Sequence, residues 1–127
     1  MLLQISARIV AGIFSLVLFL FALLQYNDID PELWVLMYGF SAIVPLLLVF
    51  RCYSRRLFWL CTGLCLAGFS VSVGGAYTYL VVFSATESLV QGMSPDKPYI
   101  EETRECFGAI IVLGVLLASQ RLRVAIG

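Results

Sequence analysis

Four long apolar segments, separated by short polar ones, constrain the fold of this chain more than any other feature. We expect them at residues 9–26, 32–50, 57–83 and 104–120. A helix needs about 20 mostly apolar residues to cross a bilayer, and only helices or closed barrels pair all their backbone groups there. The apolar runs are continuous, whereas barrel strands alternate. The sequence therefore predicts an all-α membrane protein, a four-transmembrane-helix bundle in which residues 1–127 form a single domain.

The composition agrees with a lipid environment. Hydrophobic residues make up 61% of the 127 residues and charged residues only 13%, whereas a soluble domain carries about 25% charged residues. A chain of this length has no interior large enough to hide the apolar excess. The run that follows Arg8 ends in Gln25–Asp28 without a signal-peptidase cleavage pattern. We therefore expect a retained first helix and not a cleaved leader.

The third and fourth segments differ most in length. The third would extend about 40 Å as a helix, against about 30 Å of hydrocarbon, so we expect it to tilt or to project into water. The strictly apolar part of the fourth, from Cys106 to Ser119, would reach only about 21 Å. To span the bilayer it must draw Arg104 and Glu105 to the membrane edge. Runs this short are sometimes re-entrant.

Charge is segregated between the two faces of the predicted bundle. All acidic residues fall on one side, where only Lys97 and Arg104 oppose them. The other side has no acid and carries six of the eight basic residues, namely Arg8, Arg51, Arg55, Arg56, Arg121 and Arg123. The positive-inside rule places this arginine side, and with it both termini, in the cytoplasm. We expect a multi-pass integral membrane protein with N-in/C-in orientation, in the cell (inner) membrane if the source is bacterial.

Small residues indicate the packing faces of the helices, because they let backbones approach closely in lipid. The third segment has a stripe of them at spacings of three or four: Cys61, Cys65, Gly68, Ser72 and Ala76. Comparable positions are Ala11, Ser15 and Ala22 in the first segment and Gly114 and Ala118 in the fourth. Cys61 and Cys65 lack the C-x-x-C spacing of a redox or zinc site, so we interpret them as packing residues.

Two polar clusters are predicted at the outer membrane boundary. Together they supply the candidate ligand-binding residues Gln25, Asn27, Asp28, Asp30, Trp34, Tyr38, Glu101, Glu102, Arg104 and Glu105. One interpretation is structural, because acids suit helix N-termini and Trp and Tyr anchor helices at the interface. The other is functional, because ionisable groups near lipid usually pair or line a cavity. If the first, second and fourth helices are neighbours, Asn27, Asp28, Arg104 and Glu105 could converge in a pocket suited to a hard cation, a proton relay or a polar ligand.

The same polar residues carry a resemblance to a known family. The pattern Gln25-x-Asn27-Asp28-x-Asp30, then Trp34 and Tyr38, and later Glu101-Glu102-x-Arg104-Glu105-x-x-Gly108 resembles the transmembrane protein 220 family. The resemblance covers residues 12–119. One departure is Ile29, where the family usually has a proline, and this loosens the turn. The resemblance implies a four-span membrane protein and implies no particular activity.

The sequence carries no recognisable catalytic set. It has no histidine, the usual neutral-pH base and commonest metal ligand, and no Ser-His-Asp set or Gly-rich phosphate loop. We therefore expect a non-enzymatic accessory, assembly or interaction subunit, part of a homo-oligomer or larger membrane complex, with a polar site on the non-cytoplasmic face. We expect no cofactor and no nucleic-acid partner. The alternative is a dimeric ligand- or cation-binding transporter-like module that uses the outer carboxylate and arginine cluster. A third hypothesis is a membrane enzyme in which a pair of carboxylates does acid–base work.

Overall fold

The computed structural model describes residues 1–25, 31–83 and 98–126 of the chain. In these ranges the chain forms α1 (Leu2–Leu24), α2 (Pro31–Val49), α3 (Arg55–Thr78), its π-helical continuation η2 (Tyr79–Phe83) and α4 (Pro98–Ile126). Four helices are long and apolar enough to cross a membrane, and the described ranges contain no strand. The prediction of an all-α, four-transmembrane-helix bundle is confirmed.

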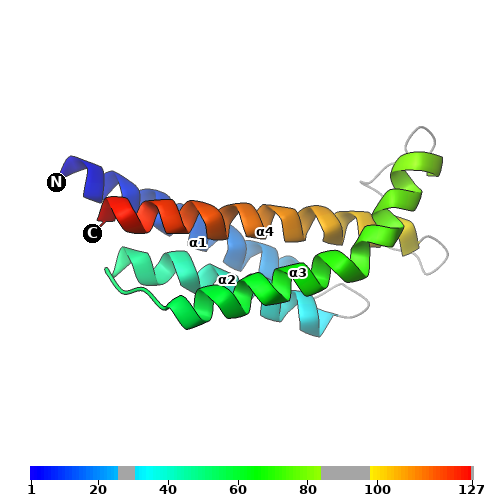
Figure 1. Cartoon of the computed structure of the whole chain (residues 1–127), viewed down its shortest axis with the longest axis horizontal. Helices are drawn as coiled ribbons and strands as arrows, with labels where there is room; N and C mark the ends of the chain where they lie inside the picture. Colours follow the sequence, from blue (N-terminus) through cyan, green and yellow to red (C-terminus); the bar gives the residue numbers. More distant parts are fainter. Residues whose placement is uncertain (26–30, 84–97, 127) are drawn as a thin grey trace.

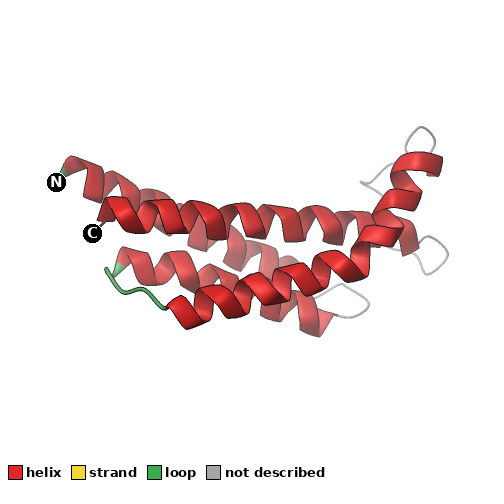
Figure 2. Ribbon diagram, in the orientation of Figure 1, coloured by secondary structure: helices red, strands yellow, loops and turns green. Residues whose placement is uncertain are grey.

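The helices run up and down alternately. Figure 1 shows the N-terminus, the C-terminus and the α2–α3 connection at the same end of the molecule. In Figure 2 nearly all of the chain outside the grey segments is helical. α2 and α4 contact each other and also contact both α1 and α3, whereas α1 and α3 do not meet within the described residues. α2 and α4 therefore form the centre of the bundle.

Local capping residues explain where three of the helices begin. Pro31 and Pro98 each occupy the first helical position, where the missing N–H would have no partner within the helix. α3 begins at Arg55 and not at residue 57, because the hydroxyl of Ser54 accepts a hydrogen bond from the backbone N–H of Leu57 at 3.1 Å. Such a cap contributes about 1 kcal/mol of helix stability.

The first and the last helix both begin earlier in the sequence than predicted. α1 begins at Leu2 and not at residue 9. α4 has 29 residues, of which Glu102–Ile126 are long and apolar enough to cross a membrane, so the expectation of a short fourth segment is wrong. The reason is that Pro98 starts the helix early, and acids near the positive end of its dipole stabilise the added turns.

The last turns of α3 bend away from the axis of the bundle (Figure 1). A straight helix over Arg55–Val82, which has 28 residues, would be about 42 Å long, more than the hydrocarbon thickness of about 30 Å. The hydroxyls of Ser70 and Ser72 donate to carbonyl oxygens one turn earlier, and η2 interrupts the α-helical hydrogen-bond pattern. Serine back-bonding and π-helical turns are both known causes of bending.

The small-residue faces lie inside the bundle on two helices and only partly inside it on the third. The predicted stripes are buried, namely Ala11, Ser15 and Ala22 in α1 and Cys61, Cys65, Gly68, Ser72 and Ala76 in α3. In α4 the expectation is wrong for Gly114, which is exposed and where a Cβ would meet nothing within 4 Å, whereas Ala118 is half-buried. α4 packs instead through a face that includes Gly108 and Ala109. Gly114 lies about 120° around the helix from Gly108.

Candidate functional site

Six of the ten predicted site residues have described side chains: Gln25, Trp34, Tyr38, Glu102, Arg104 and Glu105. Asn27, Asp28, Asp30 and the side chain of Glu101 lie outside the described residues. The six stand toward one end of the bundle, where α1 ends, α2 begins and α4 begins. We call it the carboxylate end, because Glu32, Glu102 and Glu105 lie there. The convergence of Asn27 and Asp28 with α4 stays a prediction.

Trp34 lies in the core of the bundle, with an exposed fraction of 1%. Its ring packs on Gly68 of α3, where a Cβ would come within 3.1 Å of ring atoms. The indole Nε1 is buried and has no hydrogen-bond partner among the described residues. A buried donor left unpaired costs about 1–3 kcal/mol. The interpretation of Trp34 as an interfacial anchor is therefore wrong, because its ring fills the space that a glycine leaves between α2 and α3.

Tyr38 is also buried, with an exposed fraction of 5%. The ring of Phe21 from α1 meets it edge to face, with centroids 5.7 Å apart. Its hydroxyl lies over the bare backbone of Gly108 in α4, where any Cβ would overlap it. Tyr38 thus joins α1, α2 and α4 at one level, and the anchor interpretation is wrong for it too.

Glu102 is half-buried and lies against α3. A Cβ at Gly75 would overlap the carboxylate Oε2 of Glu102 and would come within 2.5 Å of its Cβ. The acid can occupy this place only because residue 75 has no side chain. Gly75 was not among the predicted site residues. The sequence signal that could have found it is the Gly74-Gly75 pair, since a helix that carries two adjacent glycines usually has a packing reason for them.

The next turn of α4 combines ionisable and buried polar groups. Glu105 and Arg104 are half-buried, and the Oε1 atom of Glu105 is itself buried. Glu105 follows Glu102 by three residues, so both carboxylates lie along one side of the helix. Between them Thr103 is fully buried, and its hydroxyl donates to the carbonyl of Tyr99 at 2.6 Å. Ionisable groups placed in a membrane span are costly and usually mark a functional site.

Among the described residues, the side chain of Gln25 forms its hydrogen bond within its own helix and not with α2 or α4. Its Nε2 donates to the carbonyl oxygen of Phe21 at 3.2 Å, one turn earlier in α1. Its own backbone N–H completes the last hydrogen bonds of that helix. Gln25 therefore closes the end of α1.

The chemistry available at the carboxylate end is hydrogen bonding and charge pairing. Carboxylates accept hydrogen bonds and neutralise cations, and a buried indole N–H can donate one hydrogen bond. Within the described ranges, no group of three His, Cys, Asp or Glu side chains is placed to hold a metal ion.

The comparisons with known proteins agree with the fold. A family model described as transmembrane family 220, helix, matches residues 17–120. The match covers most of the chain and includes the glycine contacts at positions 68, 75 and 108, and the resemblance seen in the polar motifs is confirmed. No curated protein and no solved structure matches the chain.

Proposed function

The chain belongs to transmembrane family 220, and we propose that it acts there as a non-enzymatic interaction or assembly subunit that binds a polar or cationic group of a partner at its carboxylate end. The single observation that carries this proposal is the position of Glu102, held against the bare backbone of Gly75 inside a membrane-spanning helix. A leucine or alanine at residue 102 would avoid the desolvation of a carboxylate. The presence of an acid at this position therefore favours a binding role.

Three glycine contacts give this end a defined geometry. Trp34 rests on Gly68, Tyr38 on Gly108, and Glu102 on Gly75. Side chains packed against backbone have little rotamer freedom, so the groups are arranged before a partner arrives. Binding to such a site avoids much of the entropy cost of ordering it.

A partner within the membrane fits the rest of the molecule. The bundle exposes apolar side chains along all four helices, among them Leu16, Leu36, Leu66 and Leu117. A homo-oligomer or a larger membrane complex could use this surface.

The test is recovery of partners in mild detergent from native membranes. We expect the double variant Glu102→Gln, Glu105→Gln to lose about tenfold or more of the partner recovered by the parent chain, since truncating a buried charged contact typically costs 2 kcal/mol or more. Glu32→Gln is the matched control, because Glu32 is an exposed acid at the same end, and it should keep full recovery. Equal recovery for both variants, or a solitary monomer in every detergent, would contradict the proposal.

A second candidate function, a cation-binding transporter-like module, is favoured by one observation. Glu102 and Glu105 lie on one side of α4, and the Oε1 atom of Glu105 is buried, a combination that suits a desolvated cation. Thermal unfolding of the purified chain with sodium, magnesium or calcium chloride separates the two functions. A rise in Tm with one cation, lost in Glu105→Gln and kept in Glu32→Gln, would support the module. Equal curves with every cation would leave the interaction subunit as the better account.

The orientation of the bundle is part of the same proposal, with both termini in the cytoplasm and the carboxylate end outside. Cys52 is exposed beside the α2–α3 connection, whereas the other three cysteines are buried. A membrane-impermeant maleimide should therefore label Cys52 in inverted membrane vesicles and not in intact cells. The reverse pattern would place the arginine side outside.

A further inference from the structure

The arginine end of the bundle concentrates positive charge without acidic partners. It is defined by the six arginines Arg8, Arg51, Arg55, Arg56, Arg121 and Arg123, all in the described residues. They lie where the two termini and the α2–α3 connection meet (Figure 1), and every acid of the sequence stands in or beside the other two connections. A ligand with complementary charge for this end would therefore be an anion.

Arg51 occupies a backbone position that favours glycine. Its φ is 59°, in the left-handed region. The N–H of Arg51 donates to the carbonyl of Leu48 at 3.0 Å, and the N–H of Cys52 donates to that of Leu47 at 2.8 Å. These two bonds form the Schellman motif that ends many helices, in which the left-handed residue is usually glycine. An arginine there costs about 1 kcal/mol, and strain of this kind is often retained for function.

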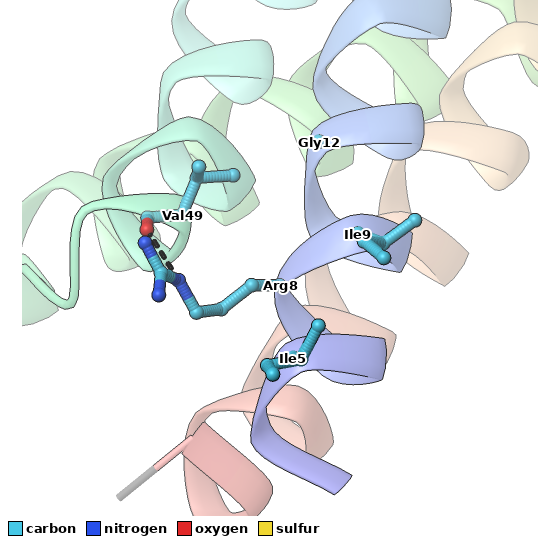
Figure 3. A pocket seen from close by; sticks show the side chains of 5 residues that line it. All are labelled: Ile5, Arg8, Ile9, Gly12 and Val49. Carbon is cyan, nitrogen blue, oxygen red and sulfur yellow. Dashed lines mark hydrogen bonds between the residues drawn. The ribbon is translucent and has the colours of Figure 1, made fainter. Parts of the chain in front are cut away.

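Arg51 and Arg8 both connect α1 with the end of α2, at one corner of the bundle. The Nη2 of Arg51 donates to Oε1 of Gln4 at 3.4 Å, and Gln4 and Arg8 are four residues apart, on the same face of α1. Figure 3 shows Arg8 reaching from α1 to the end of α2, where its Nε donates to the carbonyl of Val49 at 2.8 Å. This bond holds the guanidinium in place and uses neither Nη nitrogen.

A groove lies at this corner, beside the exposed side chains of Ile5 and Ile9 in α1. It has a volume of about 350 Å³, and it is lined by Ile5, Arg8, Ile9, Gly12 and Val49. Gly12 leaves its floor open, since a Cβ there would meet only Val49, at 3.7 Å. The lining of the groove thus combines a cationic side chain with apolar ones. This arrangement is complementary to a phosphate group followed by an acyl chain.

A second cavity, between the end of α2 and the end of α4, extends the cationic surface. It measures about 170 Å³ and is lined by Leu48, Arg51, Cys52, Tyr53, Arg123 and Ile126. The guanidinium of Arg123 lies 4.1 Å from the ring centroid of Tyr53, and the Tyr53 hydroxyl accepts a hydrogen bond from Gln120. Arg51 lines this cavity and also bonds to Gln4 on α1. Arg51, whose backbone is in the left-handed conformation, therefore lines the second cavity and connects it to α1.

We propose that this corner is a binding site for the phosphate of an anionic glycerophospholipid, with Arg8 and Arg51 on the phosphate and the groove of Ile5, Ile9 and Gly12 on an acyl chain. The lipid is favoured over a free phosphate because the lining of the groove is mostly apolar and includes the exposed side chains of Ile5 and Ile9. Basic pockets between membrane helices bind anionic headgroups by this combination. Nothing in this site depends on the carboxylate end.

The test uses the full chain in nanodiscs of equal parts phosphatidylglycerol and phosphatidylcholine, with native mass spectrometry of the lipids that stay bound. We expect phosphatidylglycerol to be retained preferentially. Arg8→Gln and Arg51→Gly should each lower that retention roughly fivefold, because each removes an arginine that contacts the phosphate directly. The matched control is Arg55→Gln with Arg56→Gln, two exposed arginines that line neither cavity, and it should change retention less than twofold.

Two variants keep the proposal testable if Arg8→Gln unfolds the chain. Arg51→Gly should raise Tm while lowering lipid retention, because glycine relieves the left-handed strain. Gly12→Leu keeps every charge and fills the groove, so it should lower retention as well. Equal losses in the control and in the site variants, or full retention in Gly12→Leu, would overturn the site. Displacement of the lipid by millimolar inorganic phosphate would overturn its assignment to a lipid.

Discussion

The carboxylate end and the arginine end of the bundle both carry charged residues at a membrane boundary, but they are packed in opposite ways. At the carboxylate end, Glu102 and Tyr38 lie directly on the backbone of Gly75 and Gly108. At the arginine end, five of six arginines are exposed and cavities remain beside α2. At the carboxylate end a charged side chain is packed closely against a neighbouring helix, whereas at the arginine end most charged side chains are exposed.

This difference separates two uses of charge in a small membrane protein. Exposed arginines cost little and can set orientation and attract anionic lipid. Half-buried acids are expensive and persist where packing or binding retains them. Substitutions at the carboxylate end should therefore change stability by about 2–3 kcal/mol, and those at the arginine end by about 1 kcal/mol or less.

The largest effect is expected from Gly75→Ala. The new Cβ would overlap the carboxylate of Glu102 and approach its Cβ within 2.5 Å, so α3 and α4 must separate. We expect the free energy of unfolding in detergent to fall by about 3 kcal/mol, the upper range for overpacking. Glu102→Ala should not restore it, since the Cβ of residue 102 remains. Gly74→Ala is the matched control, because that Cβ would meet nothing within 4 Å. A loss of equal size at both glycines would refute the contact.

Gly108→Ala should have the next largest effect, a loss of about 2 kcal/mol. Here the overlap is with the hydroxyl of Tyr38, the far end of the side chain. Tyr38→Phe in the same chain should therefore recover much of the loss, and a double-mutant cycle measures that coupling. Gly114→Ala, on the exposed face of α4, should be neutral or stabilise by up to about 1 kcal/mol. Without recovery by Tyr38→Phe, the close approach of α2 and α4 would be in doubt.

Arg123→Ala should cost only about 0.5–1 kcal/mol, the usual contribution of an exposed cation–π contact. The guanidinium lies over the Tyr53 ring, and no close-packed backbone depends on it. Arg121→Ala is the comparison, since that residue is exposed on the same helix and should change stability less. Chemical unfolding followed by circular dichroism suffices for both variants. A loss of several kilocalories per mole would show that the arginine end is packed as closely as the other end.

The smallest effect is expected from Arg55→Gln with Arg56→Gln, which should stay within about 0.5 kcal/mol of the parent chain. Both side chains are exposed in the first turn of α3. Like-charged arginines near a helix N-terminus gain nothing from the helix dipole, so their removal is expected to be slightly favourable. A measurable destabilisation would mean that these arginines make contacts in the membrane that the isolated bundle lacks.

Individual residues show how far the sequence could predict the structure. The buried stripe of Cys61, Cys65 and Gly68 was readable, because its period matches a helix and its small side chains suit close packing. The length of α4 was underestimated because apolar content alone marked its start, although Pro98 was a start signal. Of the two interpretations of Trp34 and Tyr38, as interfacial anchors or as ligand-binding residues, the first is wrong, because both side chains are buried and residue type does not tell which face of α2 turns inward.

The sequence by itself determined that four segments become helices in lipid, since each must pair its own backbone groups and the apolar content of each segment is a local property. It also determined the segregation of charge between the two ends. The tertiary structure alone decided that Glu102 lies on Gly75 and Tyr38 on Gly108. These contacts depend on how far each helix is rotated and shifted against its neighbour, and that rotation follows from the fit of all the side chains at once.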